Sequence, residues 1–466
     1  MERTLPRILL AAPKSGAGKT TVVCGLLQAL VNRGVHPAAC KCGPDYIDPL
    51  FHSEVIGAKG CNLDLFFTAE DTARHLLAQS ADGCEIAVLE GVMGYYDGLG
   101  GVTDRASAYH VATATETPVI LVLDARGTSL SLCAQIKGFL EFRKPSSIQA
   151  VLLNRCSAMQ FPMLQKAIAA ECGIPVLGYL PALPQCALES RHLGLVTAQE
   201  VADLQEKLRI LAETLTETVD LEALLNLARS APPLHWEEAE TTPERTDGPV
   251  LAVAKDKAFC FYYRENFRLL QALGAKIVEF SPLTDTELPP CDGLYLGGGY
   301  PELYTKQLSE NRSMRESIAE AIRAGLPTFA ECGGFLYLHE EMTSEDGTFP
   351  MVGVLPGGCR NTGKLRRFGY VTLTAKQDNL LCGAGEAIRA HEFHYFESDS
   401  NGAEFHAEKP VTGRGWECIH ATNTLFAGFP HLYFPANPEF ARRFVRRMRG
   451  VQKHDFERSP CSHPAH

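Results

Sequence analysis

The stretch from Leu10 to Thr21, LAAPKSGAGKTT, decides the fold of the first half of the chain. An apolar run precedes its glycines, and an amphipathic segment, Lys19–Gly34, follows them. A buried strand that turns through glycines into a helix is the setting of a phosphate-binding loop, because backbone N–H groups and the helix dipole attract an anion there. Pro13 stands where such loops commonly carry their first glycine, but the residues after it form most of the cradle. The stretch therefore predicts a strand, a phosphate-binding loop and a helix.

Within this loop, Lys19 is expected to reach the β and γ phosphates of a nucleotide, and Thr20 to ligate Mg²⁺. Lys14 leaves a second interpretation open, because partitioning and septum-site ATPases carry an extra lysine that reaches across a dimer. A switch ATPase that works as a homodimer is therefore the competing hypothesis. The predicted nucleotide contacts of the loop are Gly16, Gly18, Lys19, Thr20 and Thr21.

The alternation of strand and helix continues to about residue 229. Short, nearly continuous apolar runs suit buried parallel strands, and helical segments separate them. The pattern predicts a doubly wound α/β domain over residues 1–229. One run ends at Asn154 and Arg155, where a nucleotide base could be contacted. The expected strands are Arg7–Pro13, Glu85–Gly91, Thr117–Ala125 and Ile148–Arg155.

A change of composition separates a second domain from the first. Residues 230–248 have no periodicity and are rich in Pro, Glu and Thr, which predicts a linker. A second α/β alternation over residues 249–447 predicts another doubly wound parallel sheet, and the polar residues 448–466 predict a flexible tail. The expected strand regions are Pro249–Asp256, Ala275–Pro282, Asp292–Glu302 and Leu326–Gly334.

Composition is typical of a soluble globular protein. Of 466 residues, 45% are hydrophobic and 21% are charged, and a net charge of −11 argues against nucleic acid or an anionic membrane as the main partner. No apolar run is long enough to span a bilayer and the N-terminus does not resemble a signal peptide, so we expect a cytoplasmic protein. The 16 cysteines are scattered through apolar runs, which predicts buried, reduced thiols.

Acidic residues gather in two glycine-containing segments. KCGPDYIDP holds Asp45 and Asp48, and VLEGVMGYYDG holds Glu90 and Asp97. Carboxylates at strand ends face the crevice in which open α/β sheets bind ligands. Mg²⁺ usually takes one or two carboxylates together with phosphate oxygens. Any one of these residues also fits an ordinary surface loop, but their pairing after a phosphate-binding loop favours a ligand site.

A second set of reactive residues lies in LPTFAECGGFLYL. A strand, then Cys332, two glycines and an apolar helical segment form the pattern of a nucleophile elbow. A helix N-terminus favours the thiolate, which is the nucleophilic form of cysteine. The glycines of LYLGGGYPE could supply the N–H groups of an oxyanion hole. The histidine that activates the thiol is left open among His391, His394 and His431.

Seven motifs occur in the order seen in the cobyrinic acid a,c-diamide synthases, and over this set the chain resembles that family. They are KCGPDYIDP, EGVMGYYDG, ESRHLGL, LGGGYPE, AECGGF, RFGY and HEFHY. The resemblance extends from Pro6 to about Arg446. It implies a P-loop NTPase-like domain similar to dethiobiotin synthetase, followed by a class I glutamine amidotransferase-like domain of the cobyric acid type.

The resemblance makes Cys332 the glutaminase nucleophile and His431 the group that activates it. Many class I amidotransferases carry a glutamate two residues after this histidine. This chain has Tyr433 at that position, and the cobyric-type subgroup lacks the glutamate too. What orients His431 is therefore left open. Ala330 replaces a glycine that is common two residues before the nucleophile, which is a mild departure.

The resemblance also implies the reaction. ATP would activate the a and c carboxylates of cobyrinic acid as acyl phosphates, and ammonia from glutamine would replace the phosphate. The expected partners are small molecules alone, with hydrogenobyrinic acid or nickel-sirohydrochlorin as alternative substrates and a partitioning-type ATPase switch as the alternative of another class. Thr20, Asp45 and Glu90 are expected to hold Mg²⁺, and Asp48 and Asp97 to be catalytic by positioning substrate or intermediate. Basic candidates for the other carboxylates of the substrate are Arg191, His192, Arg366 and Arg367.

Overall fold

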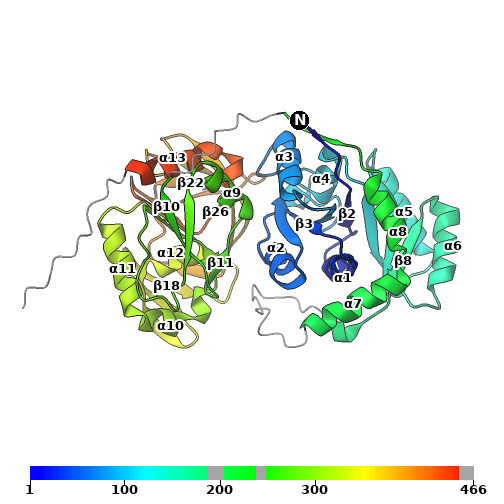
Figure 1. Cartoon of the computed structure of the whole chain (residues 1–466), viewed down its shortest axis with the longest axis horizontal. Coiled ribbons are helices and arrows are strands. Elements are labelled where there is room, and N and C mark those ends of the chain that lie inside the picture. The colour runs from blue at the N-terminus through cyan, green and yellow to red at the C-terminus, as the bar shows by residue number, and fades with distance from the viewer. Residues whose placement is uncertain (187–203, 238–247, 451–466) are drawn as a thin grey trace, which may run out of the picture. The chain divides into compact units, whose positions relative to one another are not determined.

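The structure, a computed structural model, describes residues 1–186, 204–237 and 248–450. Many of its helices and strands are labelled in Figure 1. Arg191 and His192, the tail 451–466 and residues 238–247 of the expected linker lie outside the described residues. The chain divides into two compact units. Unit 1 comprises Met1–Thr241, Phe261–Asn266 and Lys409–Gly413, and unit 2 comprises Thr242–Cys260, Phe267–Glu408 and Arg414–His466.

Unit 1 is built on a seven-stranded sheet in the order β4-β3-β5-β2-β6-β7-β8. Every neighbouring pair in it is parallel, as predicted. The strands are almost wholly buried, which suits runs that are apolar on both faces. The strands are β2 (Arg7–Ala11), β3 (Pro37–Cys42), β4 (Lys59–Leu63), β5 (Ile86–Glu90), β6 (Val119–Asp124), β7 (Ile148–Asn154) and β8 (Val176–Leu180).

The helices of unit 1 bury apolar stripes against this sheet. Helix α7 shows the cause most clearly, because Leu204, Leu208, Leu211 and Leu215 recur at helical spacing and all lie in one core cluster with α1. The helices are α1 (Lys19–Asn32), α2 (Ile47–Phe51), α3 (Glu70–Ser80), α4 (Ala108–Ala114), α5 (Ser131–Phe142), α6 (Phe161–Cys172), α7 (Leu204–Thr218) and α8 (Leu221–Arg229). Shorter helical turns are His52–Ile56, Leu99–Gly101 and Pro184–Cys186.

A short antiparallel pair joins the N-terminus to the region after α8. Strand β1 (Glu2–Arg3) pairs with β9 (Leu234–His235), so part of the segment expected as a linker forms a strand. The expectation that the cysteines are reduced is wrong for one pair, because Cys40 and Cys61 form a disulfide. The parallel register of β3 and β4 sets these two residues directly opposite each other, with Cα atoms 4.5 Å apart. The other cysteines of the described residues lie outside this disulfide.

Unit 2 contains a six-stranded sheet in the order β12-β10-β13-β15-β25-β24. Its first five strands are parallel and β24 is antiparallel at the edge. The strands are β10 (Val250–Ala254), β12 (Lys276–Phe280), β13 (Gly293–Leu296), β15 (Thr328–Glu331), β24 (His420–Ala421) and β25 (Leu425–Gly428). The helices are α9 (Arg264–Ala272), α10 (Thr305–Glu310), α11 (Arg312–Arg323), α12 (Gly333–Tyr337) and α13 (Pro438–Gly450), with helical turns at Pro301–Leu303 and Phe434–Ala436.

Two further sheets of unit 2 were not expected from the sequence. A four-stranded sheet has the order β17-β16-β18-β21 and a five-stranded antiparallel sheet has the order β23-β22-β19-β20-β26. Many residues of these strands are partly exposed, so the strands lack the continuous apolar runs that mark buried parallel ones. They are β16 (His339–Ser344), β17 (Gly347–Pro350), β18 (Leu355–Asn361), β19 (Arg367–Ala375), β20 (Ala387–His394), β21 (Phe396–Ser398), β22 (Phe405–Glu408), β23 (Gly415–Cys418) and β26 (His431–Leu432), beside the short pair β11 (Phe259–Phe261) and β14 (Gly298–Gly299).

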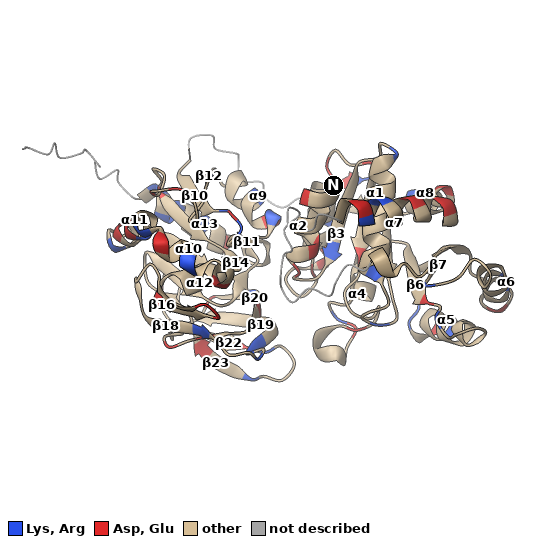
Figure 2. Ribbon diagram, turned by 90° about the horizontal axis from the view of Figure 1, so that it is seen from below, with Lys and Arg blue, Asp and Glu red and all other residues tan. Residues whose placement is uncertain are grey.

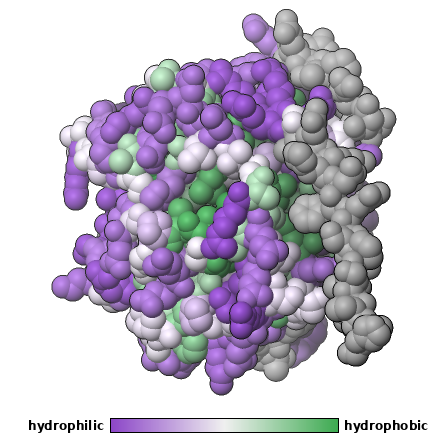
Figure 3. Space-filling view, turned by 90° about the vertical axis from the view of Figure 1, so that its left-hand side faces the viewer, coloured by the Kyte–Doolittle hydropathy of each residue, from purple (hydrophilic) through white to green (hydrophobic). Residues whose placement is uncertain are grey.

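Charged residues lie mainly on the helices and loops around the sheets. Lys, Arg, Asp and Glu gather on helices such as α8 and α11 and on loops (Figure 2). The face drawn in Figure 3 is mainly hydrophilic, with a hydrophobic patch near its centre. Among the described residues, no helix is both long enough and apolar enough to cross a membrane.

Candidate active sites

The predicted phosphate-binding loop connects β2 to α1. Gly18 has φ 87° and precedes the first helical residue, Lys19. A Cβ atom at Gly18 would lie 2.1 Å from Asn154 Nδ2, so a larger residue would displace that side chain as well as strain the backbone. Asn154 Nδ2 donates a hydrogen bond to Ala17 O (2.8 Å) and Arg155 Nη1 donates one to Gly16 O (3.3 Å). In the structure these two predicted nucleotide contacts therefore hold the loop itself.

Lys19 points toward the loop that follows β5. Its Nζ donates to the backbone oxygen of Met93, and the residue is only 8% exposed. Burial and the charge of Lys41 lower the pKa of Lys19 to about 8, although nearby carboxylates oppose them. One of those carboxylates belongs to Asp97, whose Oδ2 accepts the N–H of Gly94 (2.9 Å). Thr21, the third residue of α1, is partly exposed.

Glu90, the last residue of β5, is the centre of a buried charge network. Its Oε1 accepts hydrogen bonds from Thr20 Oγ1 (2.6 Å) and Lys41 Nζ (2.8 Å). On its other side, Oε2 lies 3.6 Å from Nε2 of His52. The side chain of Glu90 is 1% exposed, so its charge depends on these partners. The structure thus brings together Thr20 and Glu90, which lie 70 positions apart in the chain.

Lys41 extends this network to the acidic segment after β3. Its Nζ lies 2.5 Å from Asp48 Oδ2, and although burial opposes it, the carboxylates of Asp48 and Glu90 hold the pKa of Lys41 well above its ordinary value. Burial would raise the pKa of Asp48, but Lys41 lowers it to about 2. Asp45 behaves differently, because burial and the neighbouring Asp48 raise its pKa to about 7. Its Oδ1 accepts the N–H of Ile47 (2.8 Å).

Sequence reasoning missed Lys41, although it stands at the start of the quoted KCGPDYIDP segment. The signal that could have found it is a lysine in an otherwise apolar strand, just before two aspartates. A buried cation is expected only where carboxylates compensate it.

Two oxygen donors of this network fit a magnesium ion. Thr20 Oγ1 and Glu90 Oε1 are already 2.6 Å apart, beside the predicted phosphate-binding loop. Within residues 1–186, 204–237 and 248–450, no group of three or more His, Cys, Asp and Glu side chains is arranged to hold a metal. Mg²⁺ does not need such a cage, since it keeps waters and takes phosphate oxygens with one or two protein ligands. Asp45, the third expected ligand, accepts the N–H of Ile47 through Oδ1.

The second site is the turn between β15 and α12. Cys332 has φ 49° and ψ −104°, a conformation that L residues rarely adopt, and its N–H donates to Gly428 O (2.8 Å). A Cβ atom at Gly334 would lie 2.1 Å from Leu296 O, and one at Gly333 would lie 3.0 Å from Gly299 N. Glycines on both segments therefore let the elbow and the LGGGYPE loop approach closely, which is the geometry of a nucleophile elbow.

His431, on β26, is the histidine that contacts Cys332. Burial lowers its pKa, but the neighbouring Cys332 and the carboxylate of Glu331 outweigh burial and raise the pKa to about 10. His391 pairs with His431 across β20 and β26. His394 is turned to other partners, because its Nδ1 lies 2.8 Å from Phe396 O and its ring stacks on Phe429 with centroids 3.7 Å apart.

Sequence reasoning also missed Glu331, which directly precedes Cys332. Its Oε1 lies 3.6 Å from His431 Nδ1, and its side chain has no exposed surface. A glutamate at the end of an apolar strand is an anomaly that could have marked it. Of the basic candidates, Arg366 forms an ion pair with Glu397, and Arg367 packs over the ring of Trp416 at 4.4 Å.

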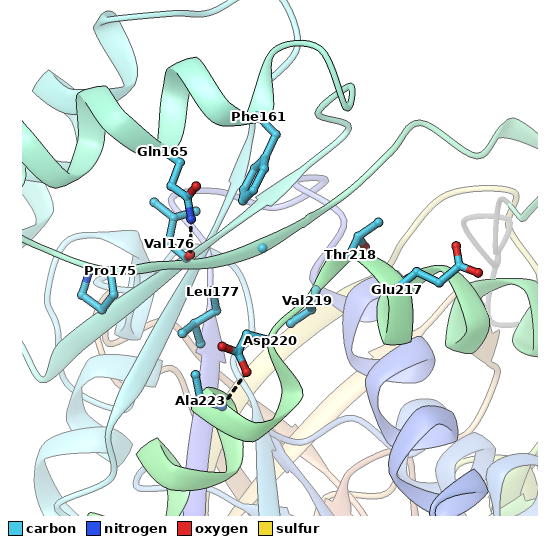
Figure 4. A pocket seen from close by; sticks show the side chains of 11 residues that line it. Phe161, Gln165, Pro175, Val176, Leu177, Glu217, Thr218, Val219, Asp220 and Ala223 are labelled. Atoms are coloured by element: carbon cyan, nitrogen blue, oxygen red, sulfur yellow. Dashed lines mark hydrogen bonds between the residues drawn. The ribbon is translucent and has the colours of Figure 1, made fainter.

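A pocket of 440 Å³ in unit 1 lies apart from these residues in the fold. Segments of α6, β8, α7 and α8 line it, and none of the candidate site residues is among its lining residues (Figure 4). Its polar groups serve the fold: Asp220 caps α8 through the N–H of Ala223 (2.9 Å), and Gln165 donates to Val176 O.

Comparison with known proteins matches a family to each half of the chain. Residues 8–196 match the CobQ/CobB/MinD/ParA nucleotide binding domain, and residues 250–439 match the CobB/CobQ-like glutamine amidotransferase domain. The chain is 40% identical over 439 residues to the cobyrinate a,c-diamide synthase of Listeria innocua serovar 6a, covering 93% of this chain and 97% of the relative. The enzymes of the same name from Listeria monocytogenes serotype 4b and Clostridium tetani are 39% and 38% identical, covering 92% and 94% of this chain and 97% and 99% of theirs. The resemblance predicted from the motifs is confirmed, and the protein belongs to the cobyrinate a,c-diamide synthase family.

Proposed function

We propose that this chain catalyses the ATP-dependent amidation of the a and c carboxylates of cobyrinate with ammonia taken from glutamine, a step of cobalamin biosynthesis. The observation that carries the proposal is the presence, in one chain, of an elbow cysteine hydrogen-bonded to a histidine and of a phosphate-binding loop joined to a buried carboxylate. The names of the relatives supply the substrate.

The ammonia half-reaction uses the site in unit 2. The Cys332 thiolate attacks the side-chain amide carbon of glutamine, and His431 gives its proton to the departing nitrogen, which leaves as NH₃. The enzyme then holds a γ-glutamyl thioester. Water attacks this thioester, His431 takes the proton of the water, and glutamate and the free thiol are released. Close approach of the Gly299 and Gly333 backbones supports an oxyanion hole at this turn.

The synthetase half-reaction uses the site in unit 1. A substrate carboxylate oxygen attacks the γ phosphorus of ATP, the bond to ADP breaks, and an acyl phosphate forms; ammonia then attacks the acyl carbon and phosphate leaves. Lys19 would hold the γ phosphate, and Asp48 and Asp97 would position the substrate or intermediate. Thr20 and Glu90, with Asp45 as a third donor, would hold Mg²⁺, which when bound neutralises charge on the β and γ phosphates. Gly16, Gly18, Thr21, Asn154 and Arg155 complete the proposed nucleotide site.

The proposed function also includes the domain limits, the cellular location and the assembly of the enzyme. We assign residues 1–229 to the ATP-dependent domain, 230–248 to a linker, 249–447 to the amidotransferase domain and 448–466 to a flexible tail. We expect a cytoplasmic enzyme whose partners are small molecules, without nucleic acid, and a homodimer is the assembly to test. The exposed Lys14 is the feature that keeps this last question open.

Glutamate release from glutamine tests the amidotransferase role. Wild type, Cys332→Ala and a matched Cys291→Ala control are compared with ATP and cobyrinate present; Cys291 is also partly buried and free. We expect release to depend on Cys332 alone. Absence of Cys332-dependent release would overturn the proposal and favour the switch ATPase. Supplying hydrogenobyrinic acid or nickel-sirohydrochlorin instead, and counting product amides by mass spectrometry, identifies the macrocycle.

A further inference from the structure

Glu331 is a buried carboxylate that the mechanism above does not use. It is the last residue of β15 and the immediate neighbour of Cys332, and no part of it reaches solvent. Burying an ionised carboxylate is costly unless hydrogen bonds or charges compensate it. The partners of Glu331 therefore indicate what the carboxylate serves.

Three partners surround this carboxylate. Tyr295 Oη donates to Oε1 (2.8 Å), and the backbone N–H of Leu432 donates to Oε2 (3.0 Å). The third is the imidazole of His431, whose Nδ1 lies 3.6 Å from Oε1. Hydrogen bonds from Tyr295 and Leu432 hold both oxygens, so the position of the carboxylate does not depend on the histidine. Leu432 follows His431 directly, so the same carboxylate contacts the backbone of β26 at Leu432 and the imidazole ring of His431.

We propose that Glu331 is the positioning residue of the glutaminase site: its carboxylate, 3.6 Å from Nδ1 of His431, pairs with the imidazole and directs the ring toward Cys332. It does from the nucleophile strand what a glutamate two residues after the histidine does in many class I amidotransferases, where this chain has Tyr433. A carboxylate of this kind fixes the tautomer of a catalytic histidine and stabilises the imidazolium that forms. The inference rests on the proposed glutaminase function.

Other titratable groups around His431 leave this role to Glu331. Cys332 is the reaction partner, and the Tyr295 hydroxyl is already bonded to the carboxylate. Two histidines of β20 are also neighbours. His391 pairs with His431 across β20 and β26. Burial lowers the pKa of His394 to about 3, so the His394 ring stays neutral across an assay range of neutral to alkaline pH. Glu331 is thus the one fixed negative charge among these neighbours of His431.

The test compares Glu331→Gln with wild type by steady-state glutaminase kinetics. We expect kcat to fall about 10²-fold while KM for glutamine changes by less than about twofold, because the carboxylate acts through His431 and does not touch glutamine. We also expect the alkaline limb of the pH profile to move about one unit or more toward neutral, since losing a nearby negative charge lowers the pKa of His431. Glu331→Asp should restore part of kcat and of the alkaline limb.

Two controls separate this role from a structural one. Glu386→Gln neutralises a carboxylate that likewise accepts a backbone N–H and pairs with a charged side chain, Arg443 at 2.7 Å, and should leave kcat unchanged. ATP-dependent amidation driven by added ammonium chloride bypasses the thiol, so Glu331→Gln should retain it. If that variant does not fold, Tyr295→Phe keeps the carboxylate and should lower kcat by less than about fivefold.

The outcomes are distinct. Unchanged kcat and an unmoved alkaline limb in Glu331→Gln, with wild-type release still dependent on Cys332, would overturn the role of Glu331 alone. Loss of ammonium-driven amidation together with glutaminase activity would also overturn it, because the residue would then serve folding. Release that does not depend on Cys332 would overturn the proposed function itself.

Discussion

The two candidate sites differ in how their buried charges are shared. In unit 1, Glu90 has Thr20, Lys41 and His52 around one carboxylate, and each comes from a different segment of the chain. In unit 2, Glu331 and Cys332 are adjacent in sequence, and His431 alone brings them into one chain of contacts.

This difference has a physical consequence. The network in unit 1 balances cations and anions before any ligand binds, so removing one member leaves a buried charge uncompensated. The site in unit 2 holds one fixed charge, that of Glu331, and a cation faces it only when the imidazole of His431 is protonated. We therefore expect substitutions in unit 1 to affect stability, and those in unit 2 to affect activity more than stability.

The largest effect is expected for Lys41→Met. The change leaves Asp48 and Glu90 without their shared cation, and breaking a buried pair in this way costs about 3–5 kcal/mol of unfolding free energy. Urea unfolding measures it. Lys255→Met is the matched control, because Lys255 Nζ also lies 2.5 Å from a carboxylate, Glu279, but both side chains are about half exposed; it should cost at most about 1 kcal/mol. Equal costs for the two variants would remove the distinction drawn for unit 1.

Lys19→Met should separate the two half-reactions. Loss of the cation at the phosphate loop is expected to lower ATP-dependent amidation about 10²–10³-fold, with glutamine or with ammonium as the nitrogen source. Glutaminase turnover measured without ATP should stay within about twofold, because its residues lie in unit 2. Amidation at wild-type rates would contradict the placement of phosphate at this loop.

Two glycines of the same loop should respond differently to alanine. Gly18→Ala puts a Cβ 2.1 Å from Asn154 Nδ2, whereas a Cβ at Gly16 meets nothing within 4 Å, although both glycines have positive φ. We expect about 1–2 kcal/mol of destabilisation at Gly16 from backbone strain alone, and about 1–3 kcal/mol more at Gly18 from overpacking. Thermal unfolding and ATP binding of the two variants give the comparison. A smaller loss at Gly18 would be inconsistent with Asn154 bracing the loop.

The pH dependence of glutaminase activity should report His431. Burial opposes the imidazolium, but Cys332 and Glu331 raise its pKa to about 10. The imidazolium form of His431 is therefore favoured below about pH 10 and is lost above it. Its contribution to stability has the same sign, being fully present below the ordinary histidine pKa of about 6.5 and lost as pH rises through about 10. An alkaline limb near neutral pH in the profile of kcat/KM would show that Cys332 and Glu331 do not hold the proton on His431.

Sequence reasoning worked where chemistry follows a short motif. Each of three features was predicted from residues within a few positions of one another, and the structure has all three. They are the parallel strands of unit 1, the loop around Lys19 and the elbow at Cys332. It failed where contacts are made across strands. The Cys40–Cys61 disulfide depends on the register of β3 and β4, and the antiparallel sheets of unit 2 lack continuous apolar runs.

The same limit applied to Lys41 and Glu331. Each is a charged residue in an apolar strand, and its meaning emerges only when residues 49 or 101 positions away are brought beside it. Glu331 neighbours Cys332 in sequence, so a charged residue in an apolar strand was visible there. Its partner on β26, His431, was not visible from the sequence.

The backbone conformation of Cys332 is strained, so the residue that carries the thiol also lowers the stability of the fold. Its φ of 49° and ψ of −104° are strained for any side chain but open to glycine. Cys332→Ala keeps the strain, while Cys332→Gly relieves about 1–3 kcal/mol of it and gives back about 0.5–1 kcal/mol in unfolded-state entropy. We therefore expect the glycine variant, which has no nucleophile, to melt above the alanine variant in calorimetry. The chain would then be trading fold stability for reactivity at the position where its thiol is presented.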